Sequence, residues 1–152
     1  MSSLVVRPLF GIASWIERAW DLLCAHREEL TTNPDLIVLK PRVAAYETLE
    51  DAGKLLVLGL FDGDDLVGYS ANLIDCNLHY GDLLVCQNDV LFVSPAHRQS
   101  RGGLLLIRTT EQEAKLRGAA LMLWHAKPGT ALEKLMPALG YRVQDIIHSK
   151  VI

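Results

Sequence analysis

Residues 91–104 read Leu91-Phe92-Val93-Ser94-Pro95-Ala96-His97-Arg98-Gln99-Ser100-Arg101-Gly102-Gly103-Leu104 and join two segments of different periodicity. The segment before them is extended and apolar, and the segment after them repeats apolar residues at helical spacing. Proline cannot donate to a strand ladder, so the strand must end at Ser94-Pro95. We therefore interpret residues 91–104 as a basic, glycine-containing loop that leads from a strand into a helix.

A loop of this kind can hold phosphate groups. Glycines let the backbone approach a ligand closely, and amides at a helix start point outward at the positive end of the helix dipole. Two arginines would add charge-assisted contacts. The Gly-Lys-Ser/Thr of a nucleotide P-loop and the spacing of a dinucleotide Gly-x-Gly-x-x-Gly are both missing, and a solvated turn without a ligand stays open as the alternative. The predicted phosphate contacts are Arg98, Gln99, Ser100, Arg101, Gly102, Gly103 and Leu104.

Upstream of the loop, the sequence predicts three consecutive antiparallel strands preceded by two helices. Leu55–Phe61 and Leu66–Leu78 form a hairpin around Asp62-Gly63-Asp64-Asp65. A third strand, Leu83–Val93, leads into the loop. The helices are predicted over residues 12–30 and 42–51 from apolar residues at helical spacing.

Downstream of the loop, the pattern is helix and then strand. Leu104–Arg117 is helix-like, Gly118 ends it, and Ala119–His125 is apolar and extended. Strand–helix–strand connections of this length make parallel neighbours. We therefore expect Ala119–His125 to lie beside Leu83–Val93 and parallel to it.

The C-terminal part is predicted to hold a last helix and a final strand. Thr130, with Glu133 three residues later, is typical of a capping box for a helix that ends at Gly140. Tyr141–Val151 is predicted as the strand. The fold class is then α+β: a mixed, mostly antiparallel central sheet with helices on both faces.

Composition excludes several classes of protein. The 152 residues, half of them hydrophobic, fit one globular domain spanning 1–152. A net charge of -3 argues against nucleic acid and against membrane surfaces as partners. The three cysteines have no metal-clip or redox spacing, no apolar run is long enough for a membrane span, and we expect a reducing cytoplasm. The five histidines have no ligand spacing, so no metal is expected.

The loop and its context resemble the GNAT acyltransferase superfamily. The motif of that family is a strand ending in Val-x-Pro, followed by Arg/Gln-x-x-Gly-x-Gly/Ala and a helix. Val93-Ser94-Pro95, Arg98 and Gly103 match it, and Leu139-Gly140-Tyr141 looks like the late Leu-Gly-Phe of the family. The resemblance covers most of the chain. It implies acetyl-CoA as co-substrate, with backbone N–H groups near Leu91, Phe92 and Val93 binding the thioester and pantetheine where paired strands part.

Two departures favour an alternative, a degenerate GNAT domain that binds CoA or a protein partner without turnover. Arg101 stands at the first motif glycine, so the usual backbone path requires that this position avoid positive φ. Met136 stands where many members carry a tyrosine that protonates the CoA thiolate, and Gly129 stands roughly where an asparagine is common.

The implied chemistry is direct attack of an amine on the thioester, which requires a deprotonated amine. A lysine-like amine has a pKa of about 10.4, so its deprotonation near pH 7 costs about 4–5 kcal/mol. Asp89, within the polar triplet Gln87-Asn88-Asp89, is the base candidate, through a water relay; a structural role at a strand irregularity is its alternative. Asn88, His79 and His125 complete the catalytic candidates.

The acceptor is expected to be an amine-bearing small molecule or protein, and a homodimer is a possible assembly. The early tryptophans, Leu78-His79-Tyr80 and the terminal Ser149-Lys150-Val151-Ile152 also look like GNAT-type proteins of tailed bacteriophages. That likeness implies action in the host cytoplasm.

Overall fold

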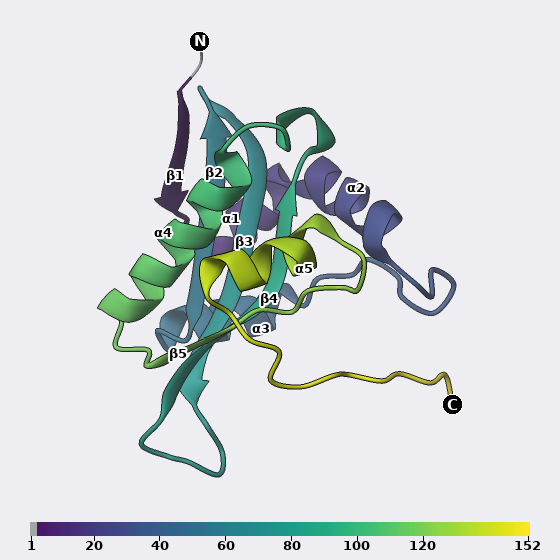
Figure 1. Cartoon of the computed structure of the whole chain (residues 1–152). Helices are drawn as coiled ribbons and strands as arrows, with labels where there is room; N and C mark the ends of the chain where they lie inside the picture. Colours follow the sequence, from purple (N-terminus) through teal and green to yellow (C-terminus); the bar gives the residue numbers. More distant parts are fainter. Residues whose placement is uncertain (1–2) are drawn as a thin grey trace.

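The computed structural model describes residues 3–152 and contains one five-stranded sheet with the order β1-β2-β3-β4-β5 (Figure 1). The strands are β1 (Leu4–Pro8), β2 (Leu55–Asp62), β3 (Asp65–Cys76), β4 (Leu84–Val93) and β5 (Leu121–Leu123). The first four pair antiparallel in sequence, and β4 pairs with β5 in parallel. The predicted mixed, mostly antiparallel sheet is confirmed, as is the parallel pairing across the crossover helix.

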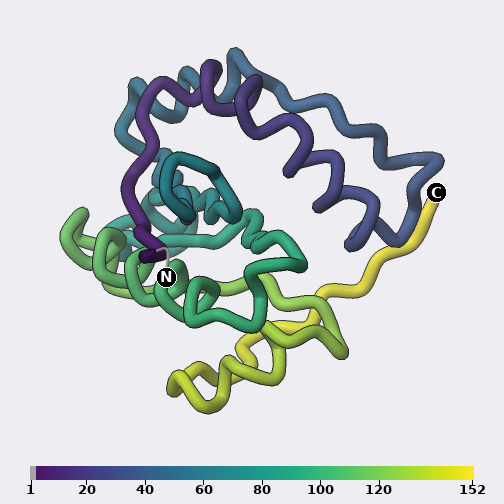
Figure 2. Tube along the Cα trace, turned by 90° about the horizontal axis from the view of Figure 1, so that it is seen from above, coloured from purple at the N-terminus to yellow at the C-terminus, as the bar shows by residue number. Residues whose placement is uncertain are grey.

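Helices cover both faces of this sheet, as predicted. They are α1 (Ile12–Arg18), α2 (Trp20–Leu30), α3 (Val43–Asp51), α4 (Gly102–Leu116) and α5 (Ala131–Leu135), with 3₁₀ turns η1 (Pro95–His97) and η2 (Met136–Leu139). Seen from above, the first three helices lie on one side of the sheet, and α4 and α5 lie on the other (Figure 2). Among residues 3–152, no helix has the length and apolar content needed to cross a bilayer.

The sequence prediction missed β1 and did not divide the first helix. The outer strand β1 has only five residues, too few for a clear period, and it is fixed by pairing with β2, some fifty residues later. The predicted helix over 12–30 is interrupted at Ala19, whose φ of -92° and ψ of 8° start a new helix at Trp20. The break redirects α2 relative to α1.

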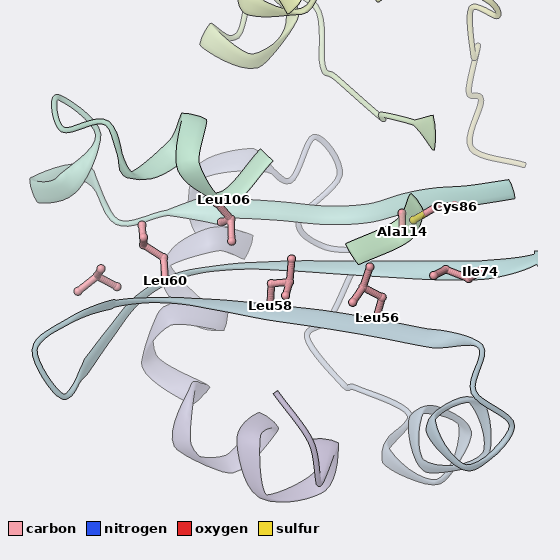
Figure 3. Close-up of a cluster of buried hydrophobic side chains, with 8 residues drawn as sticks. Leu56, Leu58, Leu60, Ile74, Cys86, Leu106 and Ala114 are labelled. Carbon is pink, nitrogen blue, oxygen red and sulfur yellow. The ribbon is translucent and has the colours of Figure 1, made fainter. Parts of the chain in front are cut away.

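Two hydrophobic cores share the strand β2. Leu56, Leu58 and Leu60 face α4, where they join Leu106 and Ala114 (Figure 3). The alternate residues Leu55, Val57 and Phe61 face α1 and α3 in the second core. Gly59 lies on that second face, where an added Cβ would come within 2.7 Å of the Phe61 ring, so glycine makes room for the aromatic side chain.

The C-terminal half of the sheet differs most from expectation. The predicted strand Ala119–His125 shrinks to the three residues of β5. The predicted final strand Tyr141–Val151 is wrong, because residues 141–152 form neither helix nor strand. Their large apolar side chains are exposed, Ile146 by 75% and Ile147 by 79%, so no buried face fixes a register for this segment.

The last helix is present but short. Thr130 accepts a hydrogen bond from the Glu133 amide, as the capping box requires. The Glu133 carboxylate bonds the amide of Gly129 instead of that of Thr130. Pro137 accompanies the change to the 3₁₀ turn η2, and Gly140 ends that turn at a φ of 86°.

Candidate active site

The sheet opens where β4 and β5 part. The two strands are paired only from Val85 opposite Leu121 to Gln87 opposite Leu123. Beyond Gln87, β4 continues to Val93, and within the described residues 3–152 this stretch pairs only with β3. Leu91, Phe92 and Val93, predicted to bind the thioester and pantetheine, therefore lie on a stretch of β4 whose other edge faces the opening.

A β-bulge at Asp89 begins the open stretch. The register between β3 and β4 shifts from Ala71 opposite Val90 to Asn72 opposite Asn88, which leaves Asp89 without a partner residue. Bulges re-aim side chains, and Asp89 is exposed here. The base candidate thus sits at a strand irregularity and is accessible at the mouth of the opening.

Asn88, a second catalytic candidate, lies in the interior. It belongs to a buried polar cluster made of Ser70, Asn72, Asn88 and Thr110, each no more than 1% exposed. The Asn88 amide donates to the Asn72 side-chain oxygen at 2.9 Å and to the Val90 carbonyl at 3.0 Å. The bond to Val90 spans the bulged residue, and the bond to Asn72 joins the two strands beside it, so this geometry fits Asn88 holding the bulge in place better than contacting a substrate.

The loop before α4 offers backbone donors as predicted. Arg101 has a φ of -76°, so the side chain at the motif-glycine position imposes no left-handed strain. The amide of Gly102 donates a hydrogen bond to the Ser100 hydroxyl. Among the residues described, the amides of Gln99, Arg101, Gly103 and Leu104 have no acceptor. Four open N–H groups at the start of a 15-residue helix fit a pyrophosphate.

His97 fixes the start of this loop. Its ring lies 2.7 Å from the Ser94 hydroxyl and 3.3 Å from the Asp62 carboxylate on β2. These contacts tie the loop to the end of the β2–β3 hairpin and hold the open amides in place.

Arg98 is already engaged. Its guanidinium makes two bonds to the Glu29 carboxylate on α2, at 2.8 and 2.5 Å, and donates to the Val93 carbonyl. The Arg98 side chain bonds hold the pKa of Glu29 below its ordinary value. Any phosphate contact by Arg98 would therefore compete with Glu29, whereas Arg101 forms no such pair among the described residues.

The structure separates the two predicted histidines. His79 lies in the β3–β4 turn, at the opposite end of β4 from the loop that leads into α4 (Figure 1). His125 lies just after β5, with its Nε2 atom 3.3 Å from the Gln87 amide nitrogen, at the point where the strands part. Of the two, only His125 is brought to the opening.

Residues that the sequence analysis did not select lie along the same opening. His26 of α2 stacks on Phe92, with ring centroids 4.8 Å apart, and its Nδ1 atom lies 2.6 Å from the Tyr69 hydroxyl. Burial lowers the pKa of His26 and raises that of Tyr69. Burial also raises the pKa of Tyr46, and the Asp89 charge adds to this rise. No periodic signal indicates that α2 covers this part of β4.

Solved structures share this arrangement of elements. An aminoglycoside acetyltransferase from an uncultured soil metagenomic sample superposes with a TM-score of 0.76, at 20% identity, over 99% of this chain and 98% of its own. An aminoglycoside N-acetyltransferase in complex with CoA superposes with a TM-score of 0.71 at 19% identity, over 99% of this chain and 96% of its own. A ribosomal-protein-alanine N-acetyltransferase from Brucella melitensis biovar Abortus 2308 superposes with a TM-score of 0.68 at 18% identity, over 99% of this chain and 98% of its own.

The chain has the GNAT acetyltransferase fold. No family model matches the chain, and no curated protein matches it in sequence. Identities of 20% or less establish the GNAT fold alone. The function must be argued from the residues at the opening.

Two positions of the GNAT fold carry no proton donor here. Met136, where the resemblance implies a tyrosine, is 8% exposed and packs at the start of η2. Gly129 adopts a φ of 81°, a conformation that suits glycine. No three His, Cys, Asp or Glu residues gather as a metal site within residues 3–152.

Proposed function

We propose that this protein is a CoA-dependent N-acyltransferase that transfers an acetyl group to an amine by direct attack on the thioester. The observation that carries the proposal is the continuity between the β4–β5 opening and the four open amides at the start of α4. The amides would hold the pyrophosphate, and the open edge of β4 would hold the extended pantetheine beside Leu91, Phe92 and Val93. The thioester would then lie near the bulge.

Asp89 is the carboxylate of this proposed site. Its exposure at the bulge suits a role in attracting an ammonium group to the thioester. Backbone N–H groups of the open stretch would stabilise the oxyanion that forms as the amine attacks. Because position 136 is a methionine and not a tyrosine, the CoA thiolate would take its proton from water or from the attacking amine.

The acceptor class follows from the same geometry. An exposed carboxylate beside the opening favours a cationic amine on a small molecule or on a protein. Two of the similar structures are aminoglycoside acetyltransferases, which supports a small-molecule acceptor. A third is a ribosomal-protein-alanine N-acetyltransferase, which supports a protein acceptor. The proposal of one domain over residues 1–152 rests on chain length and composition, and that of a phage protein acting in the host cytoplasm rests on sequence likeness.

A CoA-binding domain without turnover is the second candidate. Met136 in place of an acid and the Arg98–Glu29 pair favour it. Isothermal titration with acetyl-CoA and with CoA, followed by thiol release against an amine panel, separates the two. Binding with turnover supports the enzyme, binding without turnover supports the second candidate, and no binding contradicts both.

A further inference from the structure

Beside the opening lies a histidine, His26, that takes no part in the proposed phosphate site. His26 lies on α2, half-buried between that helix and β4. Its ring is nearly parallel to that of Phe92, at an interplanar angle of 18°, and is held by Tyr69. Tyr69 and Phe92 are themselves opposite one another on β3 and β4, so both contacts fix the ring against the sheet.

His26 faces the opening from the side of the sheet covered by α1–α3. Phe92 belongs to the stretch of β4 that β5 does not cover. Across the opening, Lys127 from the segment after β5 reaches α2 and donates to the Leu30 carbonyl. The imidazole is thus framed by α2, the open stretch of β4 and the segment that follows β5.

The surroundings favour the neutral form of this imidazole by lowering its pKa. Burial is the main cause of its lowered pKa, the charges of Lys127 and Arg98 act in the same direction, and Glu29 opposes them. When Nδ1 donates to the Tyr69 oxygen, Nε2 carries the lone pair. Among residues 3–152, Nε2 has no hydrogen-bond partner. A neutral, oriented imidazole with an open nitrogen is suited to accept a proton.

We propose that His26 is the proton acceptor of the reaction, with Tyr69 as the residue that orients its ring and Asp89 as the group that holds the incoming ammonium. This inference rests on the proposed acetyltransfer and names the residue that performs its deprotonation step. Asp89, being solvated, is better suited to attract a cation than to remove its proton.

The step balances without another reagent. The ammonium R–NH₃⁺ gives one proton to Nε2 of His26, and the freed lone pair forms the C–N bond at the thioester carbonyl carbon. The carbonyl π electrons move to oxygen and give a tetrahedral adduct. As this adduct collapses, the C=O bond re-forms and the C–S bond breaks, its electron pair leaving with the CoA thiolate. The nitrogen loses its second proton, which the thiolate takes up directly or through water. His26 returns its proton to solvent, so the products are the amide, CoA–SH and one H⁺.

Steady-state kinetics of His26→Gln test the proposal, with sisomicin, spermine and an alanine-terminated peptide as acceptors. We expect kcat at pH 7 to fall about 10²-fold or more while acetyl-CoA affinity changes less than about twofold. The acid limb that protonation of His26 gives the wild-type pH profile should disappear, and the remaining rate should rise with pH only as the acceptor itself loses its proton. Tyr69→Phe should lose about 3- to 10-fold in kcat and shift that limb, since it removes one neutral hydrogen bond. His148→Gln, in the exposed C-terminal segment, is the matched control.

The outcomes separate this inference from the proposed function. Turnover by the wild type with an unchanged kcat profile in His26→Gln overturns the role of His26 alone. Wild-type binding without turnover for every acceptor overturns both. If His26→Gln fails to fold, NMR of the histidine rings of the wild type decides: the Nε2 resonance of His26 should move when sisomicin is added to the CoA-saturated protein. A resonance that ignores every acceptor overturns the proposal.

Discussion

Arg98, in the loop before α4, and Glu29 of α2 form a bidentate ion pair that ties this loop to α2. Both side chains are partly exposed, 40% and 38%, so the pair contributes little to stability. The pair nevertheless occupies the guanidinium of Arg98, which the sequence analysis predicts to contact the phosphates of CoA, with the carboxylate of Glu29. Binding of pyrophosphate by Arg98 then requires that Glu29 be displaced.

Glu29→Gln should therefore bind CoA more tightly than the wild type. Removing the competing charge is worth at most about the strength of an exposed ion pair, so the gain should be about two- to fivefold in Kd. Titration calorimetry measures it, with Glu28→Gln, the exposed neighbour on α2, as control. Equal affinities for the three proteins would show that Arg98 does not contact the phosphates.

Arg98→Glu tests the same site from the other side. A carboxylate there would repel the pyrophosphate and face Glu29 as a like charge. We expect acetyl-CoA binding to weaken by about 1 kcal/mol or more, which is about fivefold in Kd. A folded variant with wild-type affinity would place the anion elsewhere.

Asp89→Asn should keep acetyl-CoA affinity and lower kcat/KM for the amine by about 10²-fold at neutral pH. The defect should shrink as pH rises, because more of the acceptor then arrives deprotonated. Rate measurements across pH with saturating acetyl-CoA provide the check. If Asp89→Asn tracks the wild type at every pH, Asp89 only accommodates the bulge.

Asn88→Ala should destabilise the fold by roughly 2–4 kcal/mol. The substitution removes the side-chain donor to the Val90 carbonyl, and a buried group that loses its partner costs about 1–3 kcal/mol. It also removes one of the two donors to the Asn72 side-chain oxygen, which keeps the Ser70 hydroxyl at 3.3 Å, and the loss of that second hydrogen bond costs about 0.5–1.5 kcal/mol. Urea unfolding measures the change. Gln87→Ala, the exposed neighbour, should stay within about 0.5 kcal/mol. A similar small change in Asn88→Ala would remove the bulge-holding role.

The free energy of unfolding should decrease as pH falls below about 6.5. The folded protein holds the pKa of His26 below that value, so the unfolded chain binds the proton first and acid favours unfolding. A second loss should begin below about 4.5, where protonation of Glu29 removes its pair with Arg98. Thermal melts across pH test this. In His26→Gln the first decline should flatten while the second remains.

The order of β2 to β5 and the loop that leads from β4 into α4 could be predicted because their signals are local. Alternation, the Asp62–Asp65 turn and Pro95 mark the strands, and glycines mark the helix start. The short β1 could not be predicted, because it is fixed by pairing with β2 far along the chain. The irregular structure of residues 141–152 could not be predicted either, because whether a segment forms a strand depends on such distant partners.

The site was predicted only in part for the same reason. Asp89 and the loop are visible as breaks in a pattern. His26 and Glu29, by contrast, matter only because the break at Ala19 lays α2 over the end of β4. The Asn88 side chain was placed by its polarity in a strand, but its direction depends on the bulge.

The strand β2 contributes alternate residues to both cores, so neither helical layer can leave the sheet without exposing side chains that β2 also presents to the other. Unfolding should then be a single cooperative transition and not a loss of one layer at a time. The backbone amides of Leu56 and Leu58, both fully buried, should be among the slowest to exchange with deuterium, at the rate of global opening.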